Sequence, residues 1–352
     1  MNVLCVHFGT CGGCTHQDMA DTDYRALKHR LVADALSRHG VDAPMEEVVE
    51  VPPATRRRAT MKAVKGGQSV SLGFSAARSH DIVDMHECLI LTPKLAALVP
   101  RVREMLASVL RTGESVELHV TDTDTGVDLT LRWQRPNDPA TLADLARWAS
   151  KLSLARVSRH NETLIELAKP AVRFGKATIA LPPEAFLQPT REGEVALQAF
   201  VLGAIDGANH VADLFAGCGT FALRLAERAR VHAVEIDAPM LDALAAAART
   251  TQGLKPVTTE KRNLFRRPLG EMELARFDAV CLDPPRAGAL AQVQMLARSK
   301  TERVAYVSCD ADSFARDARV MIEGGYRLAR VVPIDQFLWS AHIELAAAFE
   351  RV

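Results

Sequence analysis

The second half of the chain alternates short apolar runs with helical patterns, and this alternation constrains the fold more than any other feature. A helix is predicted from about Gly193, and it is followed by strands at 210–215, 231–236, 277–282 and 303–308, with helical segments between them. Two further strands are expected near the C-terminal end. Strands that alternate with helices form a parallel sheet covered by helices on both faces. We therefore predict an α/β domain with a doubly wound, Rossmann-like sheet of about seven strands.

The first half of the chain has a less regular texture. Helices are predicted at three places, near 24–37, 93–110 and 141–151. Candidate strands on both sides of Gly66-Gly67 predict a β-hairpin over 56–74. The texture changes around Pro182–Pro189. We therefore expect two parts, a smaller α+β region over residues 1–185 and the sheet domain over residues 186–352.

Composition limits the function classes. Acidic and basic residues balance at 43 each, so only a local basic surface can mark a nucleic-acid partner. Two basic runs, around Arg56-Arg57-Arg58 and between Lys151 and Lys176, are candidates for a phosphate-binding track. No stretch approaches the roughly 18 apolar residues of a membrane span. We expect a cytoplasmic protein, in which the seven cysteines serve a metal or catalysis before disulfides.

A glycine-rich loop follows the strand predicted at 210–215. Gly217 and Gly219 let the backbone approach a ligand closely, and the next helix offers free N–H groups at its N-terminus. Glu235 ends the following strand, where a carboxylate can accept both ribose hydroxyls. With Ala222, the loop also fits the dinucleotide fingerprint, so NAD and S-adenosylmethionine both remain open as ligands.

Another loop that could carry chemistry is Asp283-Pro284-Pro285-Arg286, which follows the strand predicted at 277–282. Its two prolines remove two backbone donors and stiffen the loop, so that Asp283 and Arg286 project into one cleft. An aromatic residue in the fourth position would indicate methylation of an exocyclic base nitrogen. Arg286 stands there instead and favours a different target atom.

A thiol and a carboxylate stand near the ends of other predicted strands. Cys309 ends the strand at 303–308, where open α/β sheets bind ligands, and it is either packed in the core or a nucleophile. His342-Ile343-Glu344 alternates, so His342 and Glu344 are expected on one side and Ile343 on the other. A carboxylate that points into a cleft can act as a general base.

Four cysteines fall outside the predicted sheet domain: Cys5, Cys11, Cys14 and Cys88. Gly12 and Gly13 let the backbone fold tightly, so that Cys11 and Cys14 can point at one centre. Four thiolates suit either Zn²⁺ or an iron–sulfur cluster.

Taken together, these residues resemble the RNA uracil-5 methyltransferase family, and more closely its iron–sulfur branch, which is known for 23S ribosomal RNA (uracil-5) methyltransferases. The matching pieces span nearly the whole chain, at 5–17, 56–59, 73–88, 186–188, 213–220, 235, 263, 283–288, 308–317 and 342–344. The resemblance implies a monomeric enzyme that uses S-adenosylmethionine to form 5-methyluridine in RNA. The implied RNA is 23S rRNA, with transfer RNA as the alternative.

The resemblance also implies roles for individual residues. The pocket for S-adenosylmethionine and substrate would be formed by Gln188, Phe215, Gly217, Gly219, Glu235, Asn263 and Asp283. Cys309 would add to uracil C6 as the nucleophile, and Glu344 would remove the C5 proton. A [4Fe–4S] cluster would be held by Cys5, Cys11, Cys14 and Cys88. The target uridine would be unpaired or flipped out.

The sequence departs from the family pattern at three points. Asp310 follows Cys309 at a position where the family commonly has Asn. The negative charge of Asp310 disfavours ionisation of the Cys309 thiol, and the positive charge of Arg286 is expected to assist it. Leu338 stands where a Pro is common, and no RNA-binding TRAM domain is expected before Cys5. Three other classes stay open: a methyltransferase acting on a base nitrogen, a non-catalytic iron–sulfur protein that binds RNA or senses redox state, and an NAD-dependent enzyme.

Overall fold

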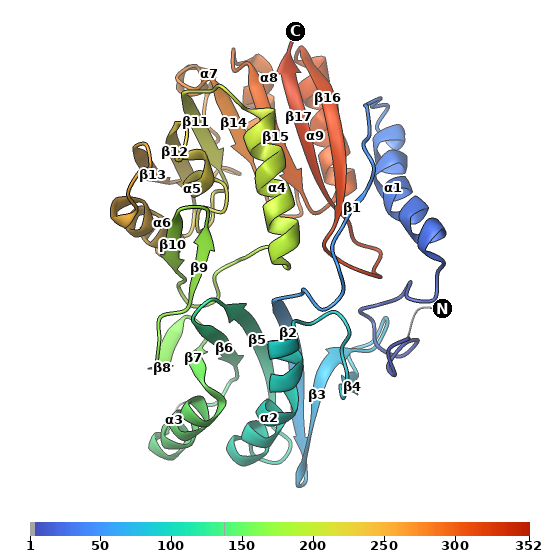
Figure 1. Ribbon diagram of the computed structural model, residues 1–352, viewed down its shortest axis with the longest axis vertical. Coiled ribbons are helices and arrows are strands. Elements are labelled where there is room, and N and C mark those ends of the chain that lie inside the picture. The colour runs from blue at the N-terminus through green and yellow to red at the C-terminus, as the bar shows by residue number, and fades with distance from the viewer. Residues whose placement is uncertain (1–3, 137) are drawn as a thin grey trace.

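Eight strands of the computed structural model, which describes residues 4–136 and 138–352, form one sheet in the upper lobe of Figure 1. Their order is β1-β16-β17-β15-β14-β11-β12-β13. They comprise β1 (Val49–Glu50), β11 (His210–Leu214), β12 (Arg230–Glu235), β13 (Val257–Lys261), β14 (Ala279–Leu282), β15 (Arg303–Ser308), β16 (Tyr326–Asp335) and β17 (Glu344–Arg351). Strands β11 to β15 are parallel, and β17 runs antiparallel to β15 and β16. This arrangement confirms the predicted doubly wound α/β sheet.

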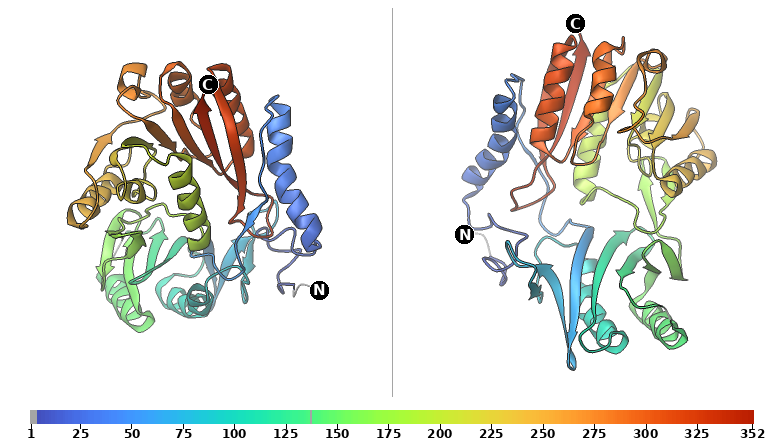
Figure 2. Two further views of the ribbon diagram at one scale, coloured as in Figure 1. Left: turned by 45° about the horizontal axis from the view of Figure 1, so that its top comes forward. Right: turned by 180° about the vertical axis from the view of Figure 1, so that it is seen from behind.

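Helices cover both faces of this sheet (Figures 1 and 2). One face carries α4 (Arg191–Ala204), α5 (Ala222–Leu225) and α6 (Ala238–Thr250). The other carries α1 (Asp21–Arg38), α7 (Glu271–Leu274), α8 (Leu290–Arg298) and α9 (Ala311–Glu323). Within β15, Val304 and Tyr306 pack into one core, while Ala305 and Val307 pack into the other. This double burial explains why the strand is a continuous apolar run in the sequence.

The lower lobe is built on a second sheet, with strand order β4-β3-β2-β5-β6-β7-β8. Its strands are β2 (Arg58–Gly66), β3 (Ser69–Ser75), β4 (Ile82–Asp84), β5 (Ser115–Thr123), β6 (Gly126–Arg132), β7 (Leu154–Arg159) and β8 (Glu162–Glu166). The pairing of β2 with β3 confirms the predicted hairpin. The apolar sides of α2 (Pro93–Val109) and α3 (Pro139–Leu152) pack on this sheet. A small hairpin, β9 (Ala171–Phe174) and β10 (Ala177–Ala180), packs instead against α6 in the upper lobe.

Helix α1 and strand β1 come from the first fifty residues but lie with the upper lobe. Strand β1 pairs with β16 at the edge of the sheet, and Val32 and Ala35 of α1 are buried in its core. Lys28 of α1 is fully buried and lies 2.8 Å from Asp335 at the end of β16. The division of the chain at residue 185 stays a prediction. Part of residues 1–185, namely α1 and β1, packs with the sheet domain.

Two members of the basic runs are not available to a phosphate in solvent. Arg57 is buried and pairs with Glu194 of α4, and Arg156 is buried and pairs with Asp128 at 2.6 Å. The phosphate-binding track stays a prediction for the other members, of which Lys151, Lys169 and Arg173 are exposed. In the part of the chain that the structure describes, no helix is both long enough and apolar enough to cross a membrane.

Candidate active site

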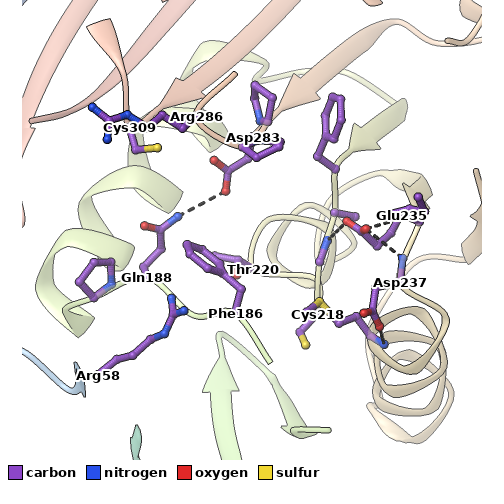
Figure 3. A pocket seen from close by; sticks show the side chains of 18 of the residues that line it. Arg58, Phe186, Gln188, Cys218, Thr220, Glu235, Asp237, Asp283, Arg286 and Cys309 are labelled. Atoms are coloured by element: carbon purple, nitrogen blue, oxygen red, sulfur yellow. Dashed lines mark hydrogen bonds between the residues drawn. The ribbon is translucent and has the colours of Figure 1, made fainter. Parts of the chain in front are cut away.

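A cavity of about 560 Å³ lies at the C-terminal ends of the parallel strands, facing the lower lobe (Figure 3). Its size falls within the range of about 300–1,000 Å³ that is usual for small-molecule sites. It is lined by eight of the nine residues that the sequence assigns to catalysis or the cofactor: Gln188, Phe215, Gly217, Glu235, Asn263, Asp283, Cys309 and Glu344. In Figure 3, Cys309, Asp283 and Gln188 lie at one end of the cavity, and Glu235 and Asp237 lie at the other.

Gly219 is the predicted cofactor residue that does not line the cavity. It has a φ of +89°, and a Cβ added to it would lie 2.8 Å from Cδ1 of Leu244 in α6. A glycine is therefore required there for close packing of the helix on the loop. Gly217 has a φ of +52°, and a Cβ added to it would meet nothing within 4 Å. Gly217 is thus the position where the loop backbone is open to a ligand.

Glu235 fixes the shape of the glycine loop. Its carboxylate accepts hydrogen bonds from the backbone N–H groups of Gly217 at 3.0 Å, Ile236 at 2.6 Å and Asp237 at 3.0 Å. An ionised carboxylate has about four acceptor positions. A ligand hydroxyl must therefore share this carboxylate with the loop. Asp237 also caps the N-terminus of α6, because its side chain accepts from Met240 N at 3.1 Å.

Asp283 and Gln188 meet at the other end of the cavity, where the Gln188 amide donates to the Asp283 carboxylate at 3.3 Å (Figure 3). Burial raises the pKa of Asp283 to about 7, and the charge of Glu235 adds to this, while the hydrogen bond from Gln188 opposes it. Burial, with the charge of Asp283, also raises the pKa of Asp213 to about 8 beneath the cavity floor. This end of the cavity therefore holds two carboxyl groups whose pKa values are raised by burial.

Cys309 follows the last residue of β15 and is partly exposed in the cavity wall, so it is not a core residue. Burial raises the pKa of its thiol to about 11, and the nearby charges of Glu344 and Asp283 act in the same direction, followed by Asp310. A thiol in this environment is mostly protonated at neutral pH. Its reactivity as a nucleophile therefore depends on what else enters the cavity.

The expected assistance of the Cys309 thiolate by Arg286 stays a prediction, and the contact that Arg286 makes in the structure is with Asp310. Arg286 Nε lies 3.0 Å from Asp310 Oδ2, and the other oxygen of Asp310 caps α9 by accepting from Ser313 N at 2.9 Å. Burial alone would raise the pKa of Asp310, but these two hydrogen bonds lower it overall. The aspartate is thus a helix cap whose charge is balanced by Arg286, and its effect on the thiol is the weakest of the three carboxylates.

Glu344 is the first residue of β17, and its side chain is only 3% exposed. Burial raises its pKa to about 8, the charge of Asp283 adds to this, and a hydrogen bond from Gln336 opposes it. The expected alternation across this segment is wrong, because the strand begins only at Glu344. His342 precedes it in a loop and is exposed, and Ile343 is buried like Glu344.

Several residues of the cavity wall were not predicted. The Arg58 guanidinium lies over the ring of Phe186, 4.5 Å from its centroid, and Phe186 is 49% exposed at the cavity rim. Phe265 packs against Phe215 with ring centroids 5.4 Å apart. Each pair joins segments that are distant along the chain, so only the tertiary structure reveals it.

A second cavity of about 280 Å³ holds the four predicted metal ligands, Cys5, Cys11, Cys14 and Cys88. All four thiols are free, and Arg56 and Phe337 line both this cavity and the larger one. A Cβ on Gly12 would lie 3.1 Å from the carbonyl oxygen of Ser75, so a glycine lets this loop pack closely on the end of β3. Among the described residues, no three His, Cys, Asp or Glu side chains are placed to hold a single metal ion.

The upper lobe defines the class of protein. Over 96% of this chain and 85% of the other, the structure superposes with a TM-score of 0.74 on Pyrococcus abyssi tRNA (uracil-54, C5)-methyltransferase in complex with S-adenosyl-L-homocysteine, at 21% sequence identity. The shared architecture is the class I methyltransferase α/β fold.

The chain belongs to the tRNA (uracil-5-)-methyltransferase family, whose model matches residues 173–352. It is 44% identical to an uncharacterized RNA methyltransferase of Rhizobium meliloti, over 99% of this chain and 85% of that protein. It is 33% identical to the 23S rRNA (uracil(1939)-C(5))-methyltransferase RlmD of Aeromonas salmonicida, over 99% of this chain and 82% of that protein. The protein is therefore an S-adenosylmethionine-dependent RNA (uracil-5-)-methyltransferase.

Proposed function

We propose that the enzyme forms 5-methyluridine in 23S rRNA, by covalent catalysis from Cys309 and proton abstraction by Glu344. The observation that carries this mechanism is that both side chains line one cavity, at the end where Asp283 and Gln188 also meet. The choice of 23S rRNA is supported by the name of the Aeromonas salmonicida relative. Transfer RNA is the alternative, because both the family description and the Pyrococcus abyssi neighbour name it. We place this activity in a monomer in the cytoplasm.

The mechanism follows from the weak nucleophilicity of uracil C5. The Cys309 sulfur adds to C6 of an unpaired or flipped uridine, and the electron pair of the C5–C6 double bond moves onto C5 and the adjacent carbonyl. C5 would then take the methyl group, whose bond to the sulfonium sulfur of S-adenosylmethionine would break with the electron pair staying on that sulfur. Glu344 takes the proton from C5, the C5–C6 double bond forms again, and the Cys309 sulfur leaves C6 as a thiolate. The products are 5-methyluridine, S-adenosylhomocysteine and the Cys309 thiolate, with the C5 proton on Glu344.

The cavity suits S-adenosylmethionine, which supplies an electrophilic methyl group when bound. We assign its binding to Phe215, Gly217, Glu235 and Asn263, with Gln188 and Asp283 between it and the uridine. Gly217 leaves space where the loop backbone faces the cavity, and Glu235 offers a carboxylate beside it. The carboxylates of Glu235 and Asp237 line this cavity at the end assigned to the cofactor. Gly219 shapes the loop and does not touch the ligand.

The test of the proposed function is to identify the methylated nucleotide. Total RNA from a strain that lacks the gene is incubated with the enzyme and S-adenosylmethionine labelled in its methyl group. We expect label at C5 of a single uridine in 23S rRNA, and RNA from the parent strain, already methylated there, serves as the control. Label in transfer RNA would establish the alternative substrate, and label on a base nitrogen would contradict the mechanism.

We also propose that Cys5, Cys11, Cys14 and Cys88 hold a [4Fe–4S] cluster. The support is that the four free thiols line one cavity. A cluster is bulkier than an ion, so its four thiolate ligands stand around a volume. A tetrahedral Zn²⁺ site would instead need four sulfurs at about 2.3 Å from one point.

Protein purified without oxygen is therefore expected to be brown, with about four iron and four sulfide ions per chain. Removal of one ligand in Cys88→Ala is expected to lower the iron content by at least about half, because a [4Fe–4S] cluster needs four thiolates. The matched control is Cys218→Ala, since Cys218 is a buried thiol of the upper lobe and lies outside the cluster cavity. Colourless protein that contains stoichiometric zinc would contradict the proposed cluster.

A further inference from the structure

A row of hydrogen bonds links Asp283 to Glu344 through two glutamines. One of them, Gln336, has no role in the proposed mechanism. The side-chain amide nitrogen of Gln336 donates to Gln188 Oε1 at 2.7 Å and to Glu344 Oε2 at 3.0 Å. Gln188 in turn donates through Nε2 to Asp283 at 3.3 Å. Gln336, Gln188 and Glu344 are each no more than 3% exposed. The row therefore lies in the buried wall behind the cavity.

The direction of this row is set by the two N–H bonds of one amide. Ionised Glu344 can only accept hydrogen bonds, so the NH₂ end of Gln336 must face it. The second N–H of that NH₂ group needs an acceptor, which is the oxygen of Gln188. The nitrogen of Gln188 is then turned towards Asp283. The orientation of Gln336 thus decides which end of the Gln188 amide points into the cavity.

We propose that Gln336 is a positioning residue, whose amide orients Gln188 towards Asp283 and fixes the Glu344 carboxylate by donating a hydrogen bond to it. This assignment rests on the proposed function, since it gives Gln336 a role at the same site. Gln336 does not line the cavity, so it acts only through Gln188 and Glu344.

The packing around Gln336 is built to hold it in this place. A Cβ on Gly193 of α4 would lie 2.6 Å from Gln336 Oε1 and 2.9 Å from Gln336 Cβ. The glycine in this helix therefore makes room for the amide. Among the described residues, Gln336 Oε1 has no hydrogen-bond donor, although it is buried. A buried amide that only supports the fold usually satisfies both of its ends. This one uses only its donor end, and both donors serve residues of the active site.

Titratable groups near Glu344 follow β14 and β15 or stand on β16 and α4, which both pack against β17. Asp283 follows β14 and Cys309 follows β15, and these two groups have no cation bound to them in the described structure. The remaining two carboxylates are already paired, Asp335 of β16 with Lys28 and Glu194 of α4 with Arg57. The Gln336 hydrogen bond opposes the rise in the pKa of Glu344 that burial and Asp283 cause. Without this donor, the pKa of Glu344 rises further. Glu344 is then ionised only at higher pH.

The test compares Gln336→Met with the natural enzyme, because methionine keeps the length of the side chain and has no N–H groups. We expect kcat at pH 7.5 to fall by about tenfold or more, as is typical when a charged group loses a hydrogen bond. The rising limb of the kcat–pH profile is expected to move about one pH unit upwards. The matched control is Gln292→Met, since Gln292 is also fully buried but bonds only to the backbone of Leu269. That variant loses comparable hydrogen bonds and keeps the natural profile.

A second readout needs no catalysis. The carboxyl titration of Glu344 is followed by infrared spectroscopy in protein without RNA, and it is assigned as the band that disappears in Glu344→Gln. In Gln336→Met this titration is expected at higher pH. If Gln336→Met does not fold, Gly193→Ala displaces the same amide and is expected to shift the titration in the same direction. The proposal is overturned if neither the infrared titration nor the pH profile moves. If the natural enzyme makes no 5-methyluridine, the proposed function fails, and the infrared titration alone decides the role of Gln336.

Discussion

Cys309→Ala is expected to abolish methylation, with a loss of at least about 10⁴-fold in rate, while S-adenosylmethionine binds nearly as before. The thiol forms the bond to C6 that makes C5 nucleophilic, so its removal takes away the step on which methylation depends. The cofactor residues lie at the other end of the cavity and are left intact. The rate is measured by transfer of labelled methyl groups to RNA, and the affinity for the cofactor by calorimetry.

Cys218→Ala is the matched control for this experiment, because Cys218 is a thiol in the same cavity wall that is buried and has no proposed role in the chemistry. It should retain activity. A Cys309→Ala enzyme that still methylates RNA would rule out covalent catalysis and leave a methyltransferase acting on a base nitrogen. The pKa of about 11 for Cys309 means that only about 10⁻⁴ of the thiol is ionised at pH 7 in the free protein. The natural enzyme should therefore work faster as the pH rises.

Glu344→Gln is expected to trap a covalent complex between protein and RNA. The glutamine cannot accept the C5 proton, so the sulfur cannot leave C6 after the methyl group has been added. Loss of a general base slows this step by about 10²–10⁴-fold. The adduct is measured as a band of lower mobility that survives denaturing electrophoresis, and it should contain the labelled methyl group.

The double variant Cys309→Ala, Glu344→Gln provides the control, since it has no sulfur to form the bond and should give no adduct. Normal turnover by Glu344→Gln would show that another group removes the proton. Asp283 is the first candidate for that role, because burial raises its pKa to about 7, close to the value for an effective base at neutral pH.

The sequence predicts best the elements that are buried on both faces. Strand β15 was predicted at its observed bounds because all its residues from Val304 to Val307 are buried and apolar. Strand β13 was not predicted, since it lies at the edge of the sheet and its sequence, Val257–Lys261, is mostly polar and exposed. Its pairing with β12 supplies what the local pattern lacks. Edge strands of this kind have little hydrophobic signal.

For the site residues, too, the sequence reveals what depends on local pattern and misses what depends on distant partners. Cys309 and Glu344 could be found because each stands at the end of a strand, where ligands bind in open sheets. The roles of Arg57 and Gln336 could not be found, because each depends on a partner far along the chain. Arg57 pairs with Glu194, and Gln336 bonds to Gln188. A charged or amide side chain in the sequence does not show whether it will face solvent or a buried partner.

The packing of α1 and β1 against the C-terminal sheet makes the lower lobe an insertion within the catalytic domain. The chain leaves the upper lobe after β1 and returns to it at the β9–β10 hairpin. Side chains also join the two lobes, because Arg57 pairs with Glu194 of α4 and Arg58 donates to the carbonyl oxygen of Leu187. The active cavity takes its walls from both lobes, with Arg58 on one and Cys309 on the other. A substitution in the inserted lobe can therefore alter the active site, although it lies far along the chain from the catalytic sheet.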